Sequence, residues 1–379
     1  MNRTKRPRGS KGSRRTGPLS RINVVDLTQN VAGPYAAMIL AELGASVTKV
    51  EPPQGDATRT WGPPFWKGHS PTYLAINRNK NLVRLDLKTD QGRTKLAKLL
   101  KRADVVLSSA RPGSMEKIGL DYRSLAKRHP RLIYGEITPF GAKGPRALEP
   151  GYDPLMQALT GIMSVTGHPG DSPIRVGVSI IDMTAGIWLA LGTLAALNIR
   201  RDSSKGHRVS VSLFETGLAW MSYHFASFWA SGVSPHGWGS GVMMIAPYEA
   251  FRTTDGWVII AAGNDGLFVN LSKAFAHPEW AGDARFRTNA VRVENRVELA
   301  RLVGEVTKGM STAELEVLLK RHGVPAAPVR DVAKALEDPQ VAALEMIQTL
   351  SGAPLPGFKS VGMPFTIDGA RPPLRAVPF

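Results

Sequence analysis

The residue best placed for chemistry in this chain is Asp182, which stands at the start of a long apolar segment. From Met183 to Arg201 the sequence is nearly uncharged until its basic end. Apolar residues on almost every side predict a buried helix. We expect Asp182 at or beside the N-cap of this helix, where backbone N–H groups and the helix dipole hold a carboxylate ionised. Such a carboxylate could be a nucleophile that forms an acyl anhydride, although Asp is also a common cap without chemistry.

Other routes to nucleophilic, metal or nucleotide chemistry find little support in the sequence. The chain has no cysteine and therefore no thiolate nucleophile or cysteine-bound metal. Its eight histidines are scattered, with no H-x-x-x-H pair, so no metal site is predicted. The turn at 28–34 holds one glycine where the dinucleotide fingerprint needs three, and no P-loop motif occurs. The sequence thus favours neither a metal nor NAD.

The elements that must position Asp182 alternate between strands and helices. The predicted strands are 22–27, 46–50, 82–87, 104–107, 132–137 and 208–213, and the predicted helices are 34–43, 90–102, 122–128 and 214–230. This alternation predicts an α/β fold with a doubly wound, mostly parallel sheet. Residues 248–252 and 257–261 then read as a β-hairpin, and helices follow near 266–276, 293–308 and 312–322, which indicates a smaller α+β domain.

Charge and hydropathy suggest a soluble, cytoplasmic protein with a basic N-terminal tail. The formal net charge is +17, and residues 1–18 contain seven Lys/Arg and no acid. We expect a disordered tail over 1–20. A basic arm can bind nucleic acid, but the rest of the chain has no aromatic-basic RNA motif or helix-turn-helix signature. The longest apolar segment is interrupted by Thr193 and Asn198, so no membrane span is predicted.

Several blocks along the chain, in order, resemble the class III CoA-transferases. This family includes formyl-CoA and carnitine CoA-transferases, with α-methylacyl-CoA racemase as a relative. The resemblance covers roughly residues 21–367. It rests on Val24-Val-Asp-Leu27, Ala32-Gly-Pro-Tyr35, Leu43-Gly-Ala-Ser-Val-Thr-Lys-Val-Glu-Pro-Pro53, Asn77-Arg-Asn-Lys80, Arg111-Pro-Gly113, Gly151-Tyr-Asp153, Pro247-Tyr-Glu-Ala-Phe251 and Gly323-Val-Pro-Ala-Ala-Pro-Val329.

The resemblance implies a fold, an assembly and a mechanism. A large Rossmann-like CoA-binding domain is expected over 21–225 and 335–379, with a small α+β domain over 226–334. Two ring-like subunits are expected to interlink as a homodimer. In this family the Asp that matches Asp182 attacks the acyl-CoA thioester to form a mixed anhydride. CoA thiolate then forms an aspartyl-CoA thioester, which the acceptor carboxylate resolves.

The resemblance also assigns residues to coenzyme A and to the substrate pocket. Leu85, Lys88 and Lys117 match positions that hold the adenine and phosphate portions of CoA, and a lysine suits phosphate. Ser109 and Ala110 stand where the family commonly has Asn-Phe, at the pantetheine. The expected polar groups of the substrate pocket are Gln29, Asn30 and Tyr152; for Gln29 and Asn30, which line the turn after the first strand, stabilisation of that turn is the alternative role.

An acyl-CoA racemase or isomerase is the alternative activity. Its chemistry needs two acid/base groups on opposite faces of the α carbon. The racemase pattern has a His where this chain has Tyr152, and an acidic residue that aligns here with Asn264, one position before Asp265. A tyrosine with a pKa near ~10 is a poor base at neutral pH. Transfer of CoA is therefore the preferred interpretation.

Overall fold

The structure is a computed structural model that describes residues 17–378. The described chain divides into two compact units. The sheet unit takes residues 17–153, 179–216 and 342–378, so both ends of the described chain contribute to it. The second unit takes residues 154–178 and 217–341. It is therefore larger than the domain expected over 226–334, because 154–178, 217–225 and 335–341 also belong to it.

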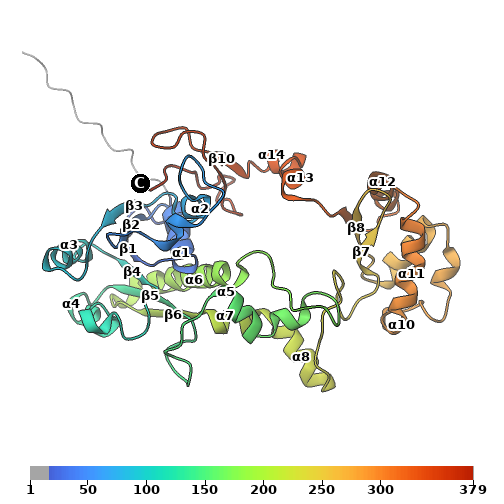
Figure 1. Ribbon diagram of the computed structural model, residues 1–379, viewed down its shortest axis with the longest axis horizontal. Helices are drawn as coiled ribbons and strands as arrows, with labels where there is room; N and C mark the ends of the chain where they lie inside the picture. The colour runs from blue at the N-terminus through green and yellow to red at the C-terminus, as the bar shows by residue number, and fades with distance from the viewer. Residues whose placement is uncertain (1–16, 379) are drawn as a thin grey trace, which may run out of the picture. The chain divides into compact units, whose positions relative to one another are not determined.

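Six parallel strands form the sheet of the first unit, in the order β3-β2-β1-β4-β5-β6 (Figure 1). The strands are β1 Asn23–Leu27, β2 Ser46–Glu51, β3 Asn81–Arg84, β4 Val105–Ser108, β5 Ile133–Thr138 and β6 Arg208–Ser212. This order is that of a doubly wound sheet, with a switch point between β1 and β4. The predicted α/β fold is thus confirmed.

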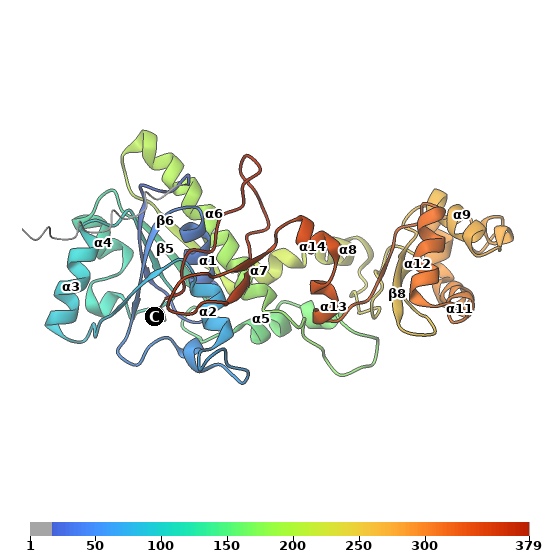
Figure 2. The same cartoon turned by 90° about the horizontal axis from the view of Figure 1, so that it is seen from above.

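Helices cover the two faces of this sheet (Figure 2). On one face, α3 (Asp90–Leu100) and α4 (Tyr122–Arg128) bury Leu96, Leu100 and Leu125 in a core shared with the strands. On the other face lie α1 (Ala32–Glu42) and α6 (Ile180–Ser203). A Cβ atom on Gly135 of β5 would lie 3.0 Å from Leu189 of α6, so the glycine lets this helix approach the sheet.

Helix α6 is buried on one side only, which corrects the expectation of burial all round. Leu189 and Ala185 are fully buried. Ile187, Trp188 and Leu191, by contrast, are 45%, 45% and 52% exposed. Among residues 17–378, α6 alone is long and apolar enough to cross a membrane. This helix packs against α1, β5 and β6.

The ends of the described chain also pack in the sheet unit. Leu19 is 8% exposed and donates its backbone N–H to the carbonyl of Leu43 at 3.0 Å. Residues 17–20 are therefore ordered, although the predicted tail extended to residue 20. The rest of that tail, 1–16, lies outside the described residues. Near the C-terminus, β10 (Ile347–Thr349) and β11 (Lys359–Val361) form a separate antiparallel pair. A hydrophobic cluster there joins Phe358 and Val377 to α2 (Pro71–Asn77).

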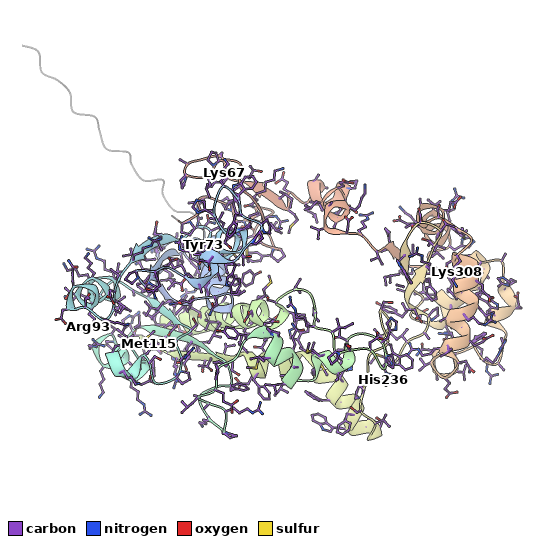
Figure 3. All side chains as sticks on the ribbon, viewed as in Figure 1. Lys67, Tyr73, Arg93, Met115, His236 and Lys308 are labelled. Atoms are coloured by element: carbon purple, nitrogen blue, oxygen red, sulfur yellow. The ribbon has the colours of Figure 1, made fainter. Side chains whose placement is uncertain are left out.

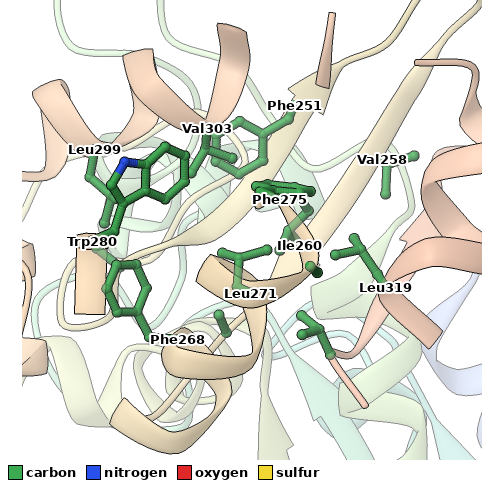
Figure 4. Close-up of a cluster of buried hydrophobic side chains, with 14 of the residues drawn as sticks. Phe251, Val258, Ile260, Phe268, Leu271, Phe275, Trp280, Leu299, Val303 and Leu319 are labelled. Atoms are coloured by element: carbon green, nitrogen blue, oxygen red, sulfur yellow. The ribbon is translucent and has the colours of Figure 1, made fainter. Parts of the chain in front are cut away.

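The second unit is built on an antiparallel sheet with the order β7-β8-β9. Its core gathers aromatic and aliphatic side chains, among them Phe251, Phe268 and Trp280 (Figure 4). The hairpin of β7 and β8 has the predicted bounds. The elements are β7 Tyr248–Arg252, β8 Trp257–Ala261, β9 Ala326–Pro328, α8 Ser222–Ser231, α9 Asp265–Ala274, α10 Asn289–Glu294, α11 Arg296–Thr307, α12 Thr312–Arg321 and α13 Val332–Leu336. Three helices, α5 (Asp153–Leu159), α7 (Leu213–Trp220) and α14 (Pro339–Ala343), span a boundary between the units.

Candidate active site

The candidate site lies at the carboxyl edge of the parallel sheet, where the turns after β1 and β4 meet. Open α/β sheets bind ligands at this switch point because the two turns leave toward opposite faces. The Ser109 hydroxyl accepts a hydrogen bond from the backbone N–H of Gln29 at 2.9 Å, which joins the two turns. Asn30 has a φ of +63°, a left-handed conformation that is uncommon outside glycine. Gln29, Asn30 and Ser109 are thus brought to one edge.

A buried charge network holds the turn after β1. Lys49 and Asp56 form an ion pair at 2.9 Å, and Lys80 and Asp26 form a second at 3.0 Å, with all four side chains inaccessible to solvent. Lys49 also donates to the Thr28 carbonyl at 2.9 Å, and Asp26 accepts from the Thr28 N–H at 3.0 Å. Burial lowers the pKa of Lys80 to about 8. Any movement that separates one of these pairs would leave a buried unpaired charge, which is costly. The network therefore holds the turn in one conformation.

Asp182 occupies the first turn of α6, in its third residue, rather than the N-cap itself. The N-cap is Ser179, whose side chain makes no capping hydrogen bond. Asp153 takes that role across a long sequence separation. Its Oδ2 accepts from the N–H of Ile181 at 2.8 Å and from the N–H of Asp182 at 3.2 Å. Asp182 thus lies three residues after the N-cap, within the first turn, and the carboxylate of Asp153 rather than its own accepts these backbone hydrogen bonds.

The electrostatics of Asp182 also differ from the expectation of a fully ionised carboxylate. Burial, with a further contribution from the charge of Asp153, raises the pKa of Asp182 to about 7. The N–H groups that would have stabilised its charge are occupied by Asp153. Near neutral pH, therefore, part of the Asp182 population is protonated and part is ionised. A carboxylate with a pKa in this range is more basic than an ordinary carboxylate, yet a useful fraction is still the anion that can attack.

Close helix packing places Asp182 at the same edge as the β1 turn. Gly186 lies one helical turn after Asp182. A Cβ atom at this position would be 2.6 Å from the carbonyl oxygen of Ala32 and 3.1 Å from the ring of Tyr35. Glycine is therefore required where α6 meets the beginning of α1. Tyr152, which directly precedes Asp153, is 57% exposed and accessible to a ligand.

The predicted CoA-binding residues lie in different environments. Lys88 and Lys117 are exposed, and neither forms an ion pair within residues 17–378. Leu85 is 4% exposed and packs in the hydrophobic core beneath β2 and β3. Its backbone N–H donates to the Glu51 carbonyl at 2.8 Å. The assignment of Leu85 to CoA can therefore not involve its side chain or its N–H, because both are already engaged in the fold.

A cavity of about 380 Å³ opens beyond the end of β4. It is bordered by Ala110 and by Met115, which is labelled in Figure 3. Arg111 and Arg123 line it, and within the described residues neither has an ion-pair partner. Arg123 lies in the first turn of α4 and was missed by the sequence reasoning, because a single arginine on a short helix carries no distinguishing pattern. The other residues that line the cavity include Ser108, Tyr122, Tyr134, Glu136, Thr138 and Arg208.

The two residues considered for a racemase in the second unit have structural roles. Asn264 is the N-cap of α9 and accepts from the N–H of Leu267 at 2.9 Å. Asp265 pairs at 2.7 Å with Arg292, whose side chain is fully buried. Because Arg292 needs this counter-charge, the carboxylate of Asp265 is held in an ion pair.

Comparison with known proteins gives a consistent result across the chain. Residues 19–378 match the family model described as CoA-transferase family III. A succinate–glutarate CoA-transferase of Agrobacterium fabrum is 36% identical over 91% of this chain and 89% of its own length. An acetyl-CoA:oxalate CoA-transferase of Acetobacter aceti is 37% identical over 90% of this chain and 88% of its own length.

Solved structures agree with the sequence relatives. A CAIB/BAIF family protein from Brucella suis superposes with a TM-score of 0.85 at 38% identity, covering 95% of each chain. A protein from Mycobacterium tuberculosis has a TM-score of 0.86 at 28% identity, covering 96% of this chain and 97% of its own. The chain belongs to CoA-transferase family III, and it is an enzyme that transfers CoA between an acyl-CoA and a carboxylic acid.

Proposed function

We propose that this protein transfers CoA through covalent intermediates on Asp182. The observation that carries the proposal is the partly buried Asp182 carboxylate in the first turn of α6, with a pKa raised to about 7 by burial and by Asp153. Within residues 17–378 its carboxylate accepts no hydrogen bond, so its lone pairs are available for attack on a carbonyl carbon.

The reaction consists of acyl transfers among Asp182, CoA and the two carboxylic acids, and it needs neither water nor an external acid. The Asp182 carboxylate attacks the thioester carbonyl, the C–S bond breaks, and CoA leaves as the thiolate while a mixed anhydride forms. The thiolate then attacks the Asp182 carbonyl and releases the donor acid as its carboxylate, which leaves an aspartyl-CoA thioester. The acceptor carboxylate attacks this thioester, and the released thiolate attacks the acceptor acyl group. The products are the new acyl-CoA and a free Asp182 carboxylate.

Positive side chains near the carboxyl edge would bind the phosphates of CoA. Lys88 and Lys117 are exposed without ion pairs in the described chain, and Arg111 and Arg123 line the cavity beyond β4. Arginine and lysine both suit phosphate, arginine by two parallel hydrogen bonds and lysine as a point charge. Ser109 and Ala110, which stand next to Arg111, would contact the pantetheine.

Small carboxylic acids are the proposed acceptors, with Gln29, Asn30 and Tyr152 as polar groups of the substrate pocket. The named relatives act on glutarate and oxalate, which supports dicarboxylic acids as the first class to test. Racemization is less well supported, because Tyr152 replaces the histidine of the racemase pattern and Asp265 is paired with Arg292.

A homodimer is also proposed. Along α6, Met183, Ile187, Leu191 and Ile199 recur on one side of the helix and are 37–52% exposed, with Trp188 beside them at 45%. An apolar helical stripe of this kind is costly in water and is typical of an interface. A second copy of the chain, as in the interlinked dimer implied by the resemblance, would cover it.

A substrate panel tests the activity. The purified protein is incubated with pairs of acyl-CoAs and carboxylic acids, and new CoA thioesters are identified by mass. Deuterium incorporation at the α carbon is scored in the same samples in D₂O. The proposal predicts a new thioester without deuterium, and Asp182→Asn is the matched inactive control. Deuterium uptake without any new thioester would support the racemase instead.

A further inference from the structure

We propose that Asp153 is a positioning residue for Asp182, because it holds the first turn of α6 through two backbone hydrogen bonds from a different helix. This inference rests on the proposed role of Asp182 as nucleophile. It concerns a buried residue that determines where the nucleophilic carboxylate lies.

The geometry assigns this role to the Asp153 side chain. The first N–H groups of a helix have no partner within the helix and need an acceptor from elsewhere. Ser179, the N-cap, supplies none from its side chain. Asp153 Oδ2 accepts from Ile181 and from Asp182 itself, at 2.8 and 3.2 Å. Because one oxygen binds the backbone of the nucleophile directly, a displaced Asp153 would displace Asp182.

Burial makes the contact rigid. Asp153 is 2% exposed, and it begins α5, 28 and 29 residues before its two partners. A buried carboxylate must be hydrogen-bonded, and here it is bonded to the positive end of a 24-residue helix. Burial and these two hydrogen bonds hold the Asp153 side chain in place.

The same arrangement affects the chemistry of Asp182. By occupying the two N–H groups, Asp153 leaves the Asp182 carboxylate without hydrogen bonds in residues 17–378. Hydrogen bonds would have stabilised that carboxylate and made it a weaker nucleophile. The negative charge of Asp153 acts in the same direction, and it is the one charged group in the described chain that perturbs Asp182.

Two substitutions separate the hydrogen bonds from the charge. Asp153→Asn keeps an acceptor oxygen for the α6 N–H groups and removes the negative charge, since Asn caps nearly as well as Asp. Asp153→Ala removes both. Asp331→Ala is the matched control, because Asp331 caps α13 in the second unit through the N–H of Lys334 at 2.8 Å.

The readouts are steady-state kinetics and the pH dependence of a single acylation turnover. We expect Asp153→Ala to lower kcat by about a hundredfold, because small misplacements of reacting groups have effects of that size, with the KM for acyl-CoA nearly unchanged. Asp153→Asn should keep most of the wild-type kcat. In the plot of acylation rate against pH, the midpoint of the rise on the acidic side should move to lower pH by about half a unit or more. Asp331→Ala should leave both readouts at wild-type values.

The outcomes decide between the two proposals. Wild-type kcat in Asp153→Ala, or an unshifted acidic limb in Asp153→Asn, overturns the positioning role. If Asp153→Ala does not fold, the pH dependence of acylation by Asp153→Asn decides whether Asp153 has the positioning role. Failure of the nucleophile assignment would look different, because Asp182→Asn would then still transfer CoA.

Discussion

Replacing Asp182 by Asn should increase the stability of the folded protein at alkaline pH while it removes the activity. The pKa of Asp182 lies near 7 in the folded protein, against an ordinary value of 3.8. When the folded-state pKa is the higher one, the contribution of the group to stability is fully present below pH 3.8 and is lost as the pH rises through 7. Asparagine is neutral throughout and avoids this loss.

The pKa difference gives the magnitude. Each pH unit is equivalent to about 1.36 kcal/mol, so an interval of about three units sets an upper limit of about 4 kcal/mol above pH 8. Because Asp182 is half-buried and partly screened by solvent, we expect Asp182→Asn to be more stable by about 2 to 4 kcal/mol at pH 8. At pH 4 the two proteins should be nearly equal.

Urea denaturation followed by circular dichroism, at pH 4, 6 and 8, measures this difference. The matched control is Asp202→Asn, which changes an exposed Asp near the other end of α6. A stability difference between Asp182→Asn and wild type that is the same at all three pH values would refute the proposed electrostatics. The wild-type rate of acyl transfer should likewise fall about tenfold per pH unit below pH 7, since only the anion attacks.

Three further predictions concern CoA binding, the buried network and assembly. Lys88→Ala and Lys117→Ala should each weaken CoA binding in titration calorimetry. The loss of affinity should shrink as the salt concentration rises, because exposed charges are screened within about 8 Å at physiological ionic strength. Wild-type affinity for CoA in both variants contradicts the assignment. Lys49→Met leaves Asp56 buried without its ion-pair partner and should cost about 3–5 kcal/mol in urea unfolding, whereas a change below about 1 kcal/mol would show that the pair contributes little. Leu191→Glu places a charge in the exposed α6 stripe and should convert the proposed dimer to a monomer in light scattering; an unchanged mass means that this stripe is not the interface.

Much of the fold could be predicted because the relevant signals are local. The turn of the β7–β8 hairpin has typical turn residues, Thr253 to Gly256. The predicted bounds of its two strands are those of the structure. The central strands of the parallel sheet, β1, β4 and β5, are short and mostly buried, and the sequence predicts them to within a few residues. Residues 17–20 were assigned to the tail because one apolar residue, Leu19, carries no pattern; its burial depends on the distant Leu43 carbonyl.

The site was less accessible from sequence because its key contacts are long-range. Asp182 stands out as the carboxylate at the start of an apolar helix, and Gln29 and Ser109 follow adjacent parallel strands. The cap of α6, in contrast, comes from Asp153, 28 residues before Ile181, and no local rule connects them. Without that contact, the helix terminus suggests a fully ionised Asp182, whereas burial and the charge of Asp153 raise its pKa.

The most direct test of the central claim is to trap the acyl group on Asp182 during turnover. Hydroxylamine is added to enzyme that is turning over an acyl-CoA and its acceptor acid, and the protein is digested and analysed by mass spectrometry. If Asp182 carries the anhydride and the CoA thioester, its side chain becomes a hydroxamate, and Asp182→Asn gives neither hydroxamate nor CoA transfer. An unmodified Asp182 in active enzyme, or CoA transfer by Asp182→Asn at the wild-type rate, would contradict the mechanism.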